Sequence, residues 1–432
     1  MKKLATPPQV PRGELAYAAS SRPLAPPCAS VRPSGTESLP SDAFSVLSAR
    51  EREQLAAGIL PSPLRGMVPA PSARALRGRG ARSARSGRHE RLQYEAVDDG
   101  WNSLGALASE KLKTEVREEQ ARSIITRNSS PDVGFEWSVN PYRGCEHGCI
   151  YCYARPGHAN LGLSPGLDFE SRIVAKVNAS ELFEKALGRP SWRGAPIAIG
   201  TYTDAYQPVE RHYRLTRRLL EIAERYGQAL TIVTKSRLIR RDIDILRQLA
   251  RRRLVRVMVA VTTLDAELAR RMEPRATTPA GRLETIGRLA DAGVPTGIML
   301  APVIPALNDH EIEHILQRAW QAGAREAAMV MLRLPAEIAE LFREWLQDHF
   351  PQRARKVLGL VSQMHGGRLY DGRFGHRMRG TGPYAWMLWR RYEATCLRLR
   401  MGMDPVVLDT SQFRQPENAA TQTELPLFEK RA

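Results

Sequence analysis

Cysteine and uninterrupted apolar runs are both scarce in this sequence. The chain has 432 residues but only five cysteines, and three of them fall between residues 145 and 152. That distribution is not a disulfide framework, and it predicts a reducing, cytoplasmic environment. No run reaches the roughly 18 apolar residues that a membrane span needs. The opening Met-Lys-Lys is followed by Pro7, Pro8 and Pro11 instead of an apolar stretch, so we predict no signal peptide.

Acidic residues are also in deficit. The chain has 64 Lys and Arg against 46 Asp and Glu, a formal net charge of +18. Such a balance favours polyanions such as DNA, RNA or acidic protein surfaces as partners. The competing explanation is an Arg-rich composition whose charges are spread over solvated helix faces. Hydrophobic residues make up 43% of the chain, which excludes a wholly disordered protein and allows one large α/β domain with appendages, or two domains.

The first 85 residues are rich in Pro, Ser, Ala, Gly and Arg and lack apolar periodicity, which predicts a disordered basic arm. Residues 74–88 are strongly basic and contain no acid. The arm has three possible interpretations. It is a functional segment, or a solvated arm without function, or the result of a start codon assigned too far upstream, since Met67 is an alternative start. The remaining boundaries that we predict are a main domain with its lead-in over 86–350, a helical extension over 351–404 and a polar tail over 405–432.

From Pro196 onward, apolar β-branched runs alternate with longer amphipathic stretches, at about the 25- to 40-residue spacing of βα units. We predict strands within 196–201, 229–236, 255–263, 295–305 and 327–335. We predict helices near 209–226, 240–252, 264–271, 279–292, 309–322 and 335–348. With one more strand leading into Cys145, these elements predict a partial (βα)6 barrel of the TIM-like kind. Its functional residues should then lie at the carboxyl ends of the strands.

The most informative segment is NPYRGCEHGCIYCYA, residues 140–154. Its spacing is Cys-x3-Cys-x2-Cys, and thiolates are ligands that suit iron–sulfur clusters or zinc. Three cysteines on a short loop can hold three corners of a cubane cluster and leave the fourth iron open. Gly144 and Gly148 would let the loop curl closely around the cluster. The alternatives are zinc, with His147 or His158 as fourth ligand, a ferredoxin with a distant fourth cysteine, and chemically idle core cysteines.

This motif, with Tyr151 before its last cysteine, resembles the radical S-adenosylmethionine (SAM) superfamily. The longer string NPYRGCEHGCIYCYARPGH, followed by GLDFE, TDAYQPVE, LTIVTKS, MEPRATTP and APVIPALND, resembles the spore photoproduct lyase-like branch. Within that branch it is most similar to the PA-0069-like subgroup of unassigned function. The resemblance covers about residues 75–400. It implies an enzyme with a [4Fe–4S] cluster that reductively cleaves SAM to a 5′-deoxyadenosyl radical, with a flavodoxin or ferredoxin as electron donor.

The resemblance also implies roles for individual residues. Cys145, Cys149 and Cys152 would bind three irons, and the fourth iron would bind the amino and carboxylate groups of SAM. Thr203 and Asp204 occupy the place where the family binds the SAM ammonium, and Arg333 would serve the SAM carboxylate or an anionic substrate. The remaining residues that would line the cofactor are Tyr151, Gly200, Lys235, Thr262 and Thr263.

One position departs from the branch. Spore photoproduct lyases carry a hydrogen-donating cysteine just before a Ser-Asp pair at the end of the second strand, where this chain has Tyr202 before Thr203 and Asp204. Reversal of a thymine photoproduct is therefore not expected here. Tyr202 is a candidate catalytic residue, as a hydrogen-atom relay, or else packs against substrate.

Three hypotheses about function remain open at this point. The first is a radical SAM enzyme acting on nucleic acid, in the manner of a DNA repair photolyase. The second is a radical SAM enzyme acting on a protein or small metabolite. The third is a non-catalytic iron–sulfur or zinc protein that binds a partner. The basic charge favours the first, although no helix-turn-helix or aromatic stacking signature is present.

Overall fold

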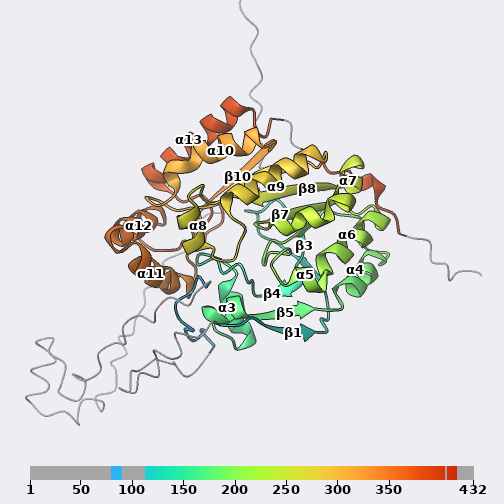
Figure 1. The fold of residues 1–432 in the computed structure, drawn as a ribbon, viewed down its shortest axis with the longest axis horizontal. Helices are drawn as coiled ribbons and strands as arrows, with labels where there is room; N and C mark the ends of the chain where they lie inside the picture. The colour runs from blue at the N-terminus through green and yellow to red at the C-terminus, as the bar shows by residue number, and fades with distance from the viewer. Residues whose placement is uncertain (1–78, 90–111, 404–405, 416–432) are drawn as a thin grey trace, which may run out of the picture. The chain divides into compact units, whose positions relative to one another are not determined.

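The computed structural model describes residues 79–89, 112–403 and 406–415. Its main feature is a seven-stranded sheet of order β10-β9-β8-β7-β6-β3-β2 (Figure 1). Six of these strands run parallel, and β2 (Ile125–Arg127) pairs antiparallel with β3 at one edge. The parallel strands are β3 (Trp137–Val139), β6 (Ile197–Ile199), β7 (Leu230–Thr234), β8 (Val255–Ala260), β9 (Thr296–Val303) and β10 (Glu326–Met331).

The partial (βα)6 barrel is thereby confirmed. Strands β6 to β10 each lie within a predicted apolar run, and their side chains form the main core with the covering helices. A helix precedes each of these strands, as parallel pairing requires. The helices between the strands are α4 (Ala179–Leu187), α5 (Glu210–Tyr213), α6 (Leu215–Tyr226), α7 (Ile243–Arg251), α8 (Ala266–Met272), α9 (Pro279–Asp291) and α10 (Ile312–Gln321).

The predicted single helix over 209–226 is wrong in one respect, because it is broken into α5 and α6. Arg214 between them adopts a left-handed conformation with φ of 50°. The carboxylate of Glu210 accepts hydrogen bonds from the Thr216 amide at 3.2 Å, so it caps the start of α6. Other helix starts follow the sequence signals directly. Asp265 caps α8 through two backbone amides, and Thr278 caps α9, which begins with Pro279.

A second, smaller sheet was not predicted. It has the order β1-β5-β4 and joins β1 (Glu115–Glu119), β5 (Arg172–Lys176) and β4 (Tyr142–Arg143). Strand β4 comes directly after β3 in the chain, and α3 (Leu167–Ser171) comes directly before β5. The cysteine loop therefore leaves the small sheet rather than the barrel strand itself. This sheet escaped prediction because its strands are short and, in β1, mostly exposed.

The disorder predicted for the arm does not extend to its last residues. Residues 79–85 belong to the described part of the chain, and Gly80 and Ala81 are buried. Their amides donate to the two Glu170 carboxylate oxygens, both at 2.8 Å. Further along, Arg82 forms an ion pair with Asp348 at 2.7 Å. Arg82, Arg85 and Arg88, which belong to the predicted basic stretch, thus pair with acids of the folded domain. The rest of the arm lies outside the described residues.

The helix predicted near 335–348 is α11 (Ile338–His349). The range predicted as a helical extension contains α12 (Pro351–Met364) and, after a long connection, α13 (Gly382–Leu399). Of the predicted polar tail, residues 406–415 lie against the domain, where Phe413 stacks on Tyr226 and Arg414 donates its amide to the Tyr226 carbonyl at 2.9 Å. Among the described residues, no helix combines the length and apolar character that crossing a membrane requires.

Candidate active site

The cysteine loop, residues 145–152, lies between the small sheet and the carboxyl ends of the barrel strands. The Cys145 amide donates to the Phe169 carbonyl at 2.9 Å, and the Ile150 amide donates to the Met272 carbonyl at 3.0 Å. Gly144 and Gly148 have φ of 73° and 67°. A Cβ on Gly148 would lie 2.7 Å from a Glu170 carboxylate oxygen, so the close curl needs glycine there, as the sequence predicts.

A buried ion pair supports this loop from one side. Arg155 and Glu170 form an ion pair in which both side chains are fully buried. Arg155 also donates to the carbonyls of Cys149 at 2.9 Å and Gly148 at 3.2 Å. Glu170 additionally receives the amides of Gly80 and Ala81. This pair therefore joins the amino-terminal segment to the cysteine loop.

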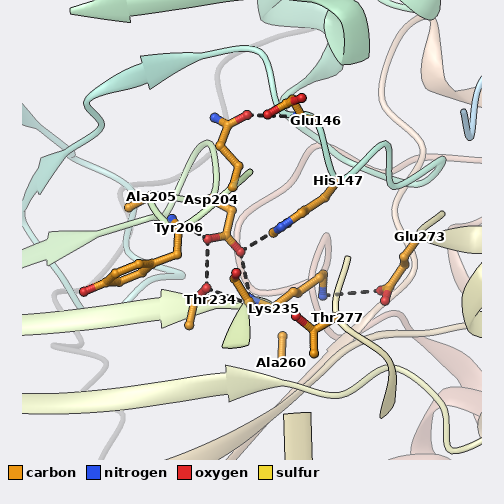
Figure 2. Close-up of polar contacts among 12 residues, drawn as sticks. Glu146, His147, Asp204, Ala205, Tyr206, Thr234, Lys235, Ala260, Glu273 and Thr277 are labelled. Carbon is orange, nitrogen blue, oxygen red and sulfur yellow. Dashed lines mark hydrogen bonds and ion pairs between the residues drawn. The ribbon is translucent and has the colours of Figure 1, made fainter. Parts of the chain in front are cut away.

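A second carboxylate, that of Asp204, joins the loop to the strand ends (Figure 2). It accepts from the Thr234 hydroxyl at 2.8 Å and from the Lys235 amide at 2.7 Å, both at the end of β7. It also accepts from the Tyr206 amide at 2.8 Å and lies 3.3 Å from His147 Nδ1. His147 holds the pKa of this carboxyl below its ordinary value, against the effect of burial. A carboxylate has about four acceptor sites, and these four donors occupy them. Asp204 therefore positions the groups around it.

A third carboxylate, that of Glu273, gathers the side chains of the strand ends. It is fully buried and accepts from the Tyr151 hydroxyl, from Thr262 Oγ1 at 2.6 Å and from the Arg282 guanidinium. Lys235 Nζ lies 3.5 Å from it, as Figure 2 shows, and 5.7 Å from the centre of the Tyr151 ring. Burial lowers the pKa of Lys235 to about 8. We call Tyr151, Asp204, Lys235, Thr262 and Glu273 the inner network.

The other predicted cofactor residues lie near this network in different arrangements. Thr203 is buried, and its hydroxyl donates to the Tyr142 carbonyl at 3.0 Å. Gly200 has φ of 80°, and a Cβ there would overlap the Val233 carbonyl of the neighbouring strand. Thr263 donates its hydroxyl to Glu311, and so turns toward η5 (Asp309–Glu311). All three follow parallel strands at their carboxyl ends, but their contact with a cofactor stays a prediction.

Arg333 and Tyr202 lie apart from the inner network. Arg333 follows β10, and its guanidinium carbon lies 4.3 Å from the centre of the Tyr153 ring. Tyr202 packs edge-on against the Tyr153 ring at 6.2 Å, and a Cβ on Gly157 would overlap its hydroxyl. Since Tyr153 and Gly157 flank the end of the cysteine loop, Tyr202 lies beside that loop.

The three thiols suit a cluster better than a single metal ion. Cys145 and Cys149 are buried, Cys152 is partly buried, and burial raises the pKa of all three. Among the described residues, no three His, Cys, Asp or Glu side chains are arranged to hold one metal ion. Cysteines of a cubane bind three different irons, so they need not converge on one point. The histidines considered for zinc have other contacts: His147 with Asp204, and His158 with the Arg172 carbonyl at 3.1 Å.

Open (βα)6 architecture and a three-cysteine loop at the strand ends together define a class of cluster-binding barrel. The family model described as the radical SAM superfamily matches residues 139–319. An uncharacterised protein of Mycobacterium tuberculosis strain H37Rv is 37% identical over 269 residues, covering 59% of this chain and 78% of its own. The chain therefore belongs to the radical SAM superfamily, whose members use a [4Fe–4S] cluster, SAM and an electron donor.

Other relatives are more distant. An uncharacterised protein of Methanocaldococcus jannaschii is 27% identical, with 56% of this chain and 85% of that protein covered. A radical SAM Nα-GlyT isomerase of Pseudomonas phage M6 is 23% identical, over 53% of this chain and 46% of that protein. Among solved structures, a spore photoproduct lyase complexed with dinucleoside spore photoproduct superposes with a TM-score of 0.49 at 16% identity, over 66% of this chain and 79% of that one.

Several residues of the site were not predicted from the sequence. Arg155, Glu170 and Glu273 have no assigned role in the motif analysis, although they lie within or beside its quoted strings. Glu273 binds Arg282, while Arg275, two residues further along the chain, lies 3.0 Å from Glu146 in the cysteine loop. A buried charge shows itself only through partners distant in sequence, so no local pattern could have identified it.

Proposed function

We propose that this chain is a radical SAM enzyme that acts on nucleic acid, and that Cys145, Cys149 and Cys152 hold its cluster. The observation that carries the proposal is the placement of the three thiols on one closely curled loop beside the inner network. The phage relative, which is named as an isomerase of the radical SAM type, supports a catalytic role over a merely structural cluster.

When bound, the reduced cluster supplies one electron that cleaves SAM to methionine and a 5′-deoxyadenosyl radical, which takes a hydrogen atom from the substrate. The protein's part is to bind and orient the reactants and to limit water. Thr203 keeps two hydroxyl lone pairs that can accept from the SAM ammonium while its proton is donated to Tyr142. Lys235, held by Glu273, is the cation proposed to bind the SAM carboxylate.

Nucleic acid as the substrate class is supported by the net charge of +18 and by the resemblance of the motifs to the spore photoproduct lyase-like branch. Asp204 orients the end of β7 and the loop histidine, and Thr262 orients Glu273. Tyr151, Gly200 and Thr263 complete the set of predicted contacts with SAM. Of the two roles predicted for Arg333, the SAM carboxylate or an anionic substrate, we assign it the substrate. A flavodoxin or ferredoxin is the proposed electron donor.

The test is anaerobic purification with a reconstituted cluster, followed by assay of 5′-deoxyadenosine after reduction with dithionite. We expect deoxyadenosine release that depends on SAM, and that rises when DNA is supplied. Release with no response to DNA or RNA would leave a radical SAM enzyme with a protein or metabolite substrate. No release from a protein with about four irons would overturn catalysis altogether.

A further inference from the structure

Arg333 has no counter-charge in the described part of the chain. Its side chain is partly buried after β10, yet no hydrogen bond or ion pair joins it to any described residue. Its neighbours are the Tyr153 ring, at 4.3 Å, and a second cation, Arg377. A partly buried cation without an anion is costly, and it is therefore a place where an anionic ligand gains free energy.

Exposed aromatic rings surround this guanidinium. Tyr153 and Tyr202 are each 41% exposed, and Phe374 is 56% exposed. Tyr153 packs edge-on against Tyr202, and the Arg377 guanidinium carbon lies 4.7 Å from the centre of the Phe374 ring. Along one continuous set of contacts, two rings (Tyr202 and Tyr153) are followed by two guanidinium groups (Arg333 and Arg377) and then by a third ring (Phe374). We call Tyr153, Tyr202, Arg333, Phe374 and Arg377 the aromatic–arginine rim.

The connection between α12 and α13, residues 365–381, holds the outer part of this rim in place. The Met331 amide at the end of β10 donates to the Met378 carbonyl at 2.9 Å. Asp132, in the connection between β2 and β3, accepts from the Gly375 amide and from Arg377 Nε, both at 2.6 Å. Strands β10 and β2 are the two edges of the main sheet. The connection thus links both edges and fixes Phe374 at the rim.

The inner end of the rim reaches the cysteine loop. Tyr153 directly follows Cys152, and its hydroxyl donates to the Thr201 carbonyl. Tyr202 packs against Gly157, and its pKa is raised by burial and by the nearby Cys152. A ligand that lies along the rim would consequently have one end beside the place proposed for the cluster.

We propose that the aromatic–arginine rim binds single-stranded DNA, with bases stacked on its rings and a backbone phosphate on Arg333. The proposal rests on the proposed function and names how its substrate is bound. Exposed rings beside guanidinium groups match the bases and phosphates of a single strand. Paired bases in a duplex hide their faces, so a single strand or an extruded nucleotide is the form that fits. An acidic peptide would satisfy Arg333 but would leave the rings without partners.

The test is binding of a dye-labelled oligothymidylate of about 12 nucleotides to the anaerobic holoenzyme, measured by fluorescence anisotropy over a range of salt. Phe374→Ala should weaken binding roughly 5- to 150-fold, the loss of one base–aromatic stack. Arg333→Gln should reduce the slope of log K against log salt by about 0.7, the loss of one phosphate contact to a single strand. Phe374→Tyr should restore most of the affinity, because it keeps the ring.

A matched pair of controls lies at the other end of the sheet. Arg325 stacks on Trp320, which is 39% exposed, and Arg325 immediately precedes the amino end of β10. Trp320→Ala and Arg325→Gln remove an exposed ring and a cation of the same kind, and should leave oligonucleotide affinity within about 2-fold, since surface charges contribute little singly. If the control variants lost as much oligonucleotide affinity as the rim variants, the binding would be non-specific electrostatic attraction. That result would overturn the proposal.

Two further measurements decide which ligand Arg333 serves. SAM affinity, measured by isothermal titration, should fall in Lys235→Gln and stay unchanged in Arg333→Gln. A fall in SAM affinity in Arg333→Gln with normal DNA binding would assign the guanidinium to the SAM carboxylate and overturn the phosphate contact. Tighter binding of the matched uridylate would overturn the assignment to DNA in favour of RNA. Since binding needs no reduction, the outcomes can be told apart. DNA binding that is unchanged in the rim variants refutes the rim alone, and deoxyadenosine release without any DNA binding refutes both the rim and the nucleic-acid substrate. DNA binding without release refutes the proposed catalysis alone.

Discussion

The inner network and the aromatic–arginine rim differ in how fully their charged groups are satisfied. Asp204 accepts three hydrogen bonds and lies beside His147, and Glu273 accepts from Tyr151, Thr262 and Arg282. In the rim, by contrast, Arg333 has the Tyr153 ring, Arg377, Tyr370 and Cys152 near it, and no carboxylate of the described residues pairs with it. One region is fixed before any ligand arrives, and the other has unused binding capacity.

This difference fits the division of labour expected in a radical enzyme. A cluster and its cofactor need fixed geometry, which buried and fully hydrogen-bonded side chains provide. A macromolecular substrate needs accessible groups, and exposed rings and cations provide these. Substitutions in and around the cysteine loop are therefore expected to have the largest effects, and substitutions in the aromatic–arginine rim the smallest.

The largest effect is expected from removing a cluster ligand. Cys149→Ala should abolish a stoichiometry of about four irons per chain and all SAM cleavage, because no other described thiol can replace the missing corner. Iron analysis, the visible absorption spectrum and deoxyadenosine assay measure this. Cys145→Ala and Cys152→Ala should behave in the same way.

Cys396→Ala is the matched control, since this cysteine lies on α13 and is partly buried among Tyr392 and its neighbours. Its replacement, like that of Cys28, should leave the iron content unchanged. Full iron loading in Cys149→Ala would refute the assignment of the cluster ligands.

The second effect concerns the buried pair behind the loop. Glu170→Gln leaves the Arg155 charge buried without a partner, so the free energy of unfolding should fall by about 3–5 kcal/mol. Urea unfolding of the anaerobic protein measures this loss. Iron should also be released earlier in the titration than from the parent protein, because Arg155 holds the Cys149 carbonyl.

Glu340→Gln is the control for that experiment. Glu340 pairs with Arg343 on the surface of α11, where both side chains are about half exposed. Its replacement should change the free energy of unfolding by less than about 1 kcal/mol. If the two variants lost equal stability, the buried pair would have no special role in holding the loop.

Much of the barrel could be predicted from the sequence, because its signals are local. Most residues of strands β6 to β9 are buried, so a short sequence window detects these strands as apolar runs. The small sheet could not be predicted in this way. Its strand β4 has two residues, and its pairing partners come from segments far apart in the chain. The order of residues 79–89 likewise depends on Glu170, which no local pattern connects to them.

In the candidate site, too, features with a local sequence signal could be predicted, and features that depend on distant contacts could not. The cysteine spacing and the glycines around it are local signals, and the predicted loop conformation agrees with the structure at Gly144 and Gly148. The oxygens of Asp204 accept from backbone and side-chain donors, a set of partners that no local pattern predicts. Only the three-dimensional arrangement reveals that Arg333 lacks an anion. Contacts of the cysteines and the other site residues with cluster and cofactor stay predictions.

A third experiment uses pH to test how rigid the support of the cysteine loop is. His158 packs edge-on against Phe169 behind Gly144, and burial lowers its pKa from 6.5 to about 4. Between these values the unfolded chain binds a proton that the folded chain does not, so stability is lost as the pH falls from about 6.5 to about 4. His158→Gln should reduce the slope of unfolding free energy against pH by up to about 1.4 kcal/mol per unit.

Exposed His314 on α10 is the control, because its replacement by Gln removes a histidine without removing a buried one. Urea titrations at several pH values, with both variants in the same cluster state, measure the slopes. An unchanged slope in His158→Gln would mean that the imidazole is protonated in the folded chain, and that the packing behind the loop is looser than the structure shows.

The smallest effect is expected at Tyr202, where the two regions meet. Tyr202→Phe keeps the ring that packs on Tyr153 and removes only the hydroxyl. If Tyr202 serves as a stacking surface, oligonucleotide affinity, deoxyadenosine release and substrate conversion should all stay within about 2-fold, since the ring supplies the stack. Normal deoxyadenosine release with collapsed conversion would instead assign the phenol a hydrogen-atom relay. Tyr202→Ala separates packing from chemistry, because it should weaken DNA binding in either case while leaving iron content and SAM affinity unchanged.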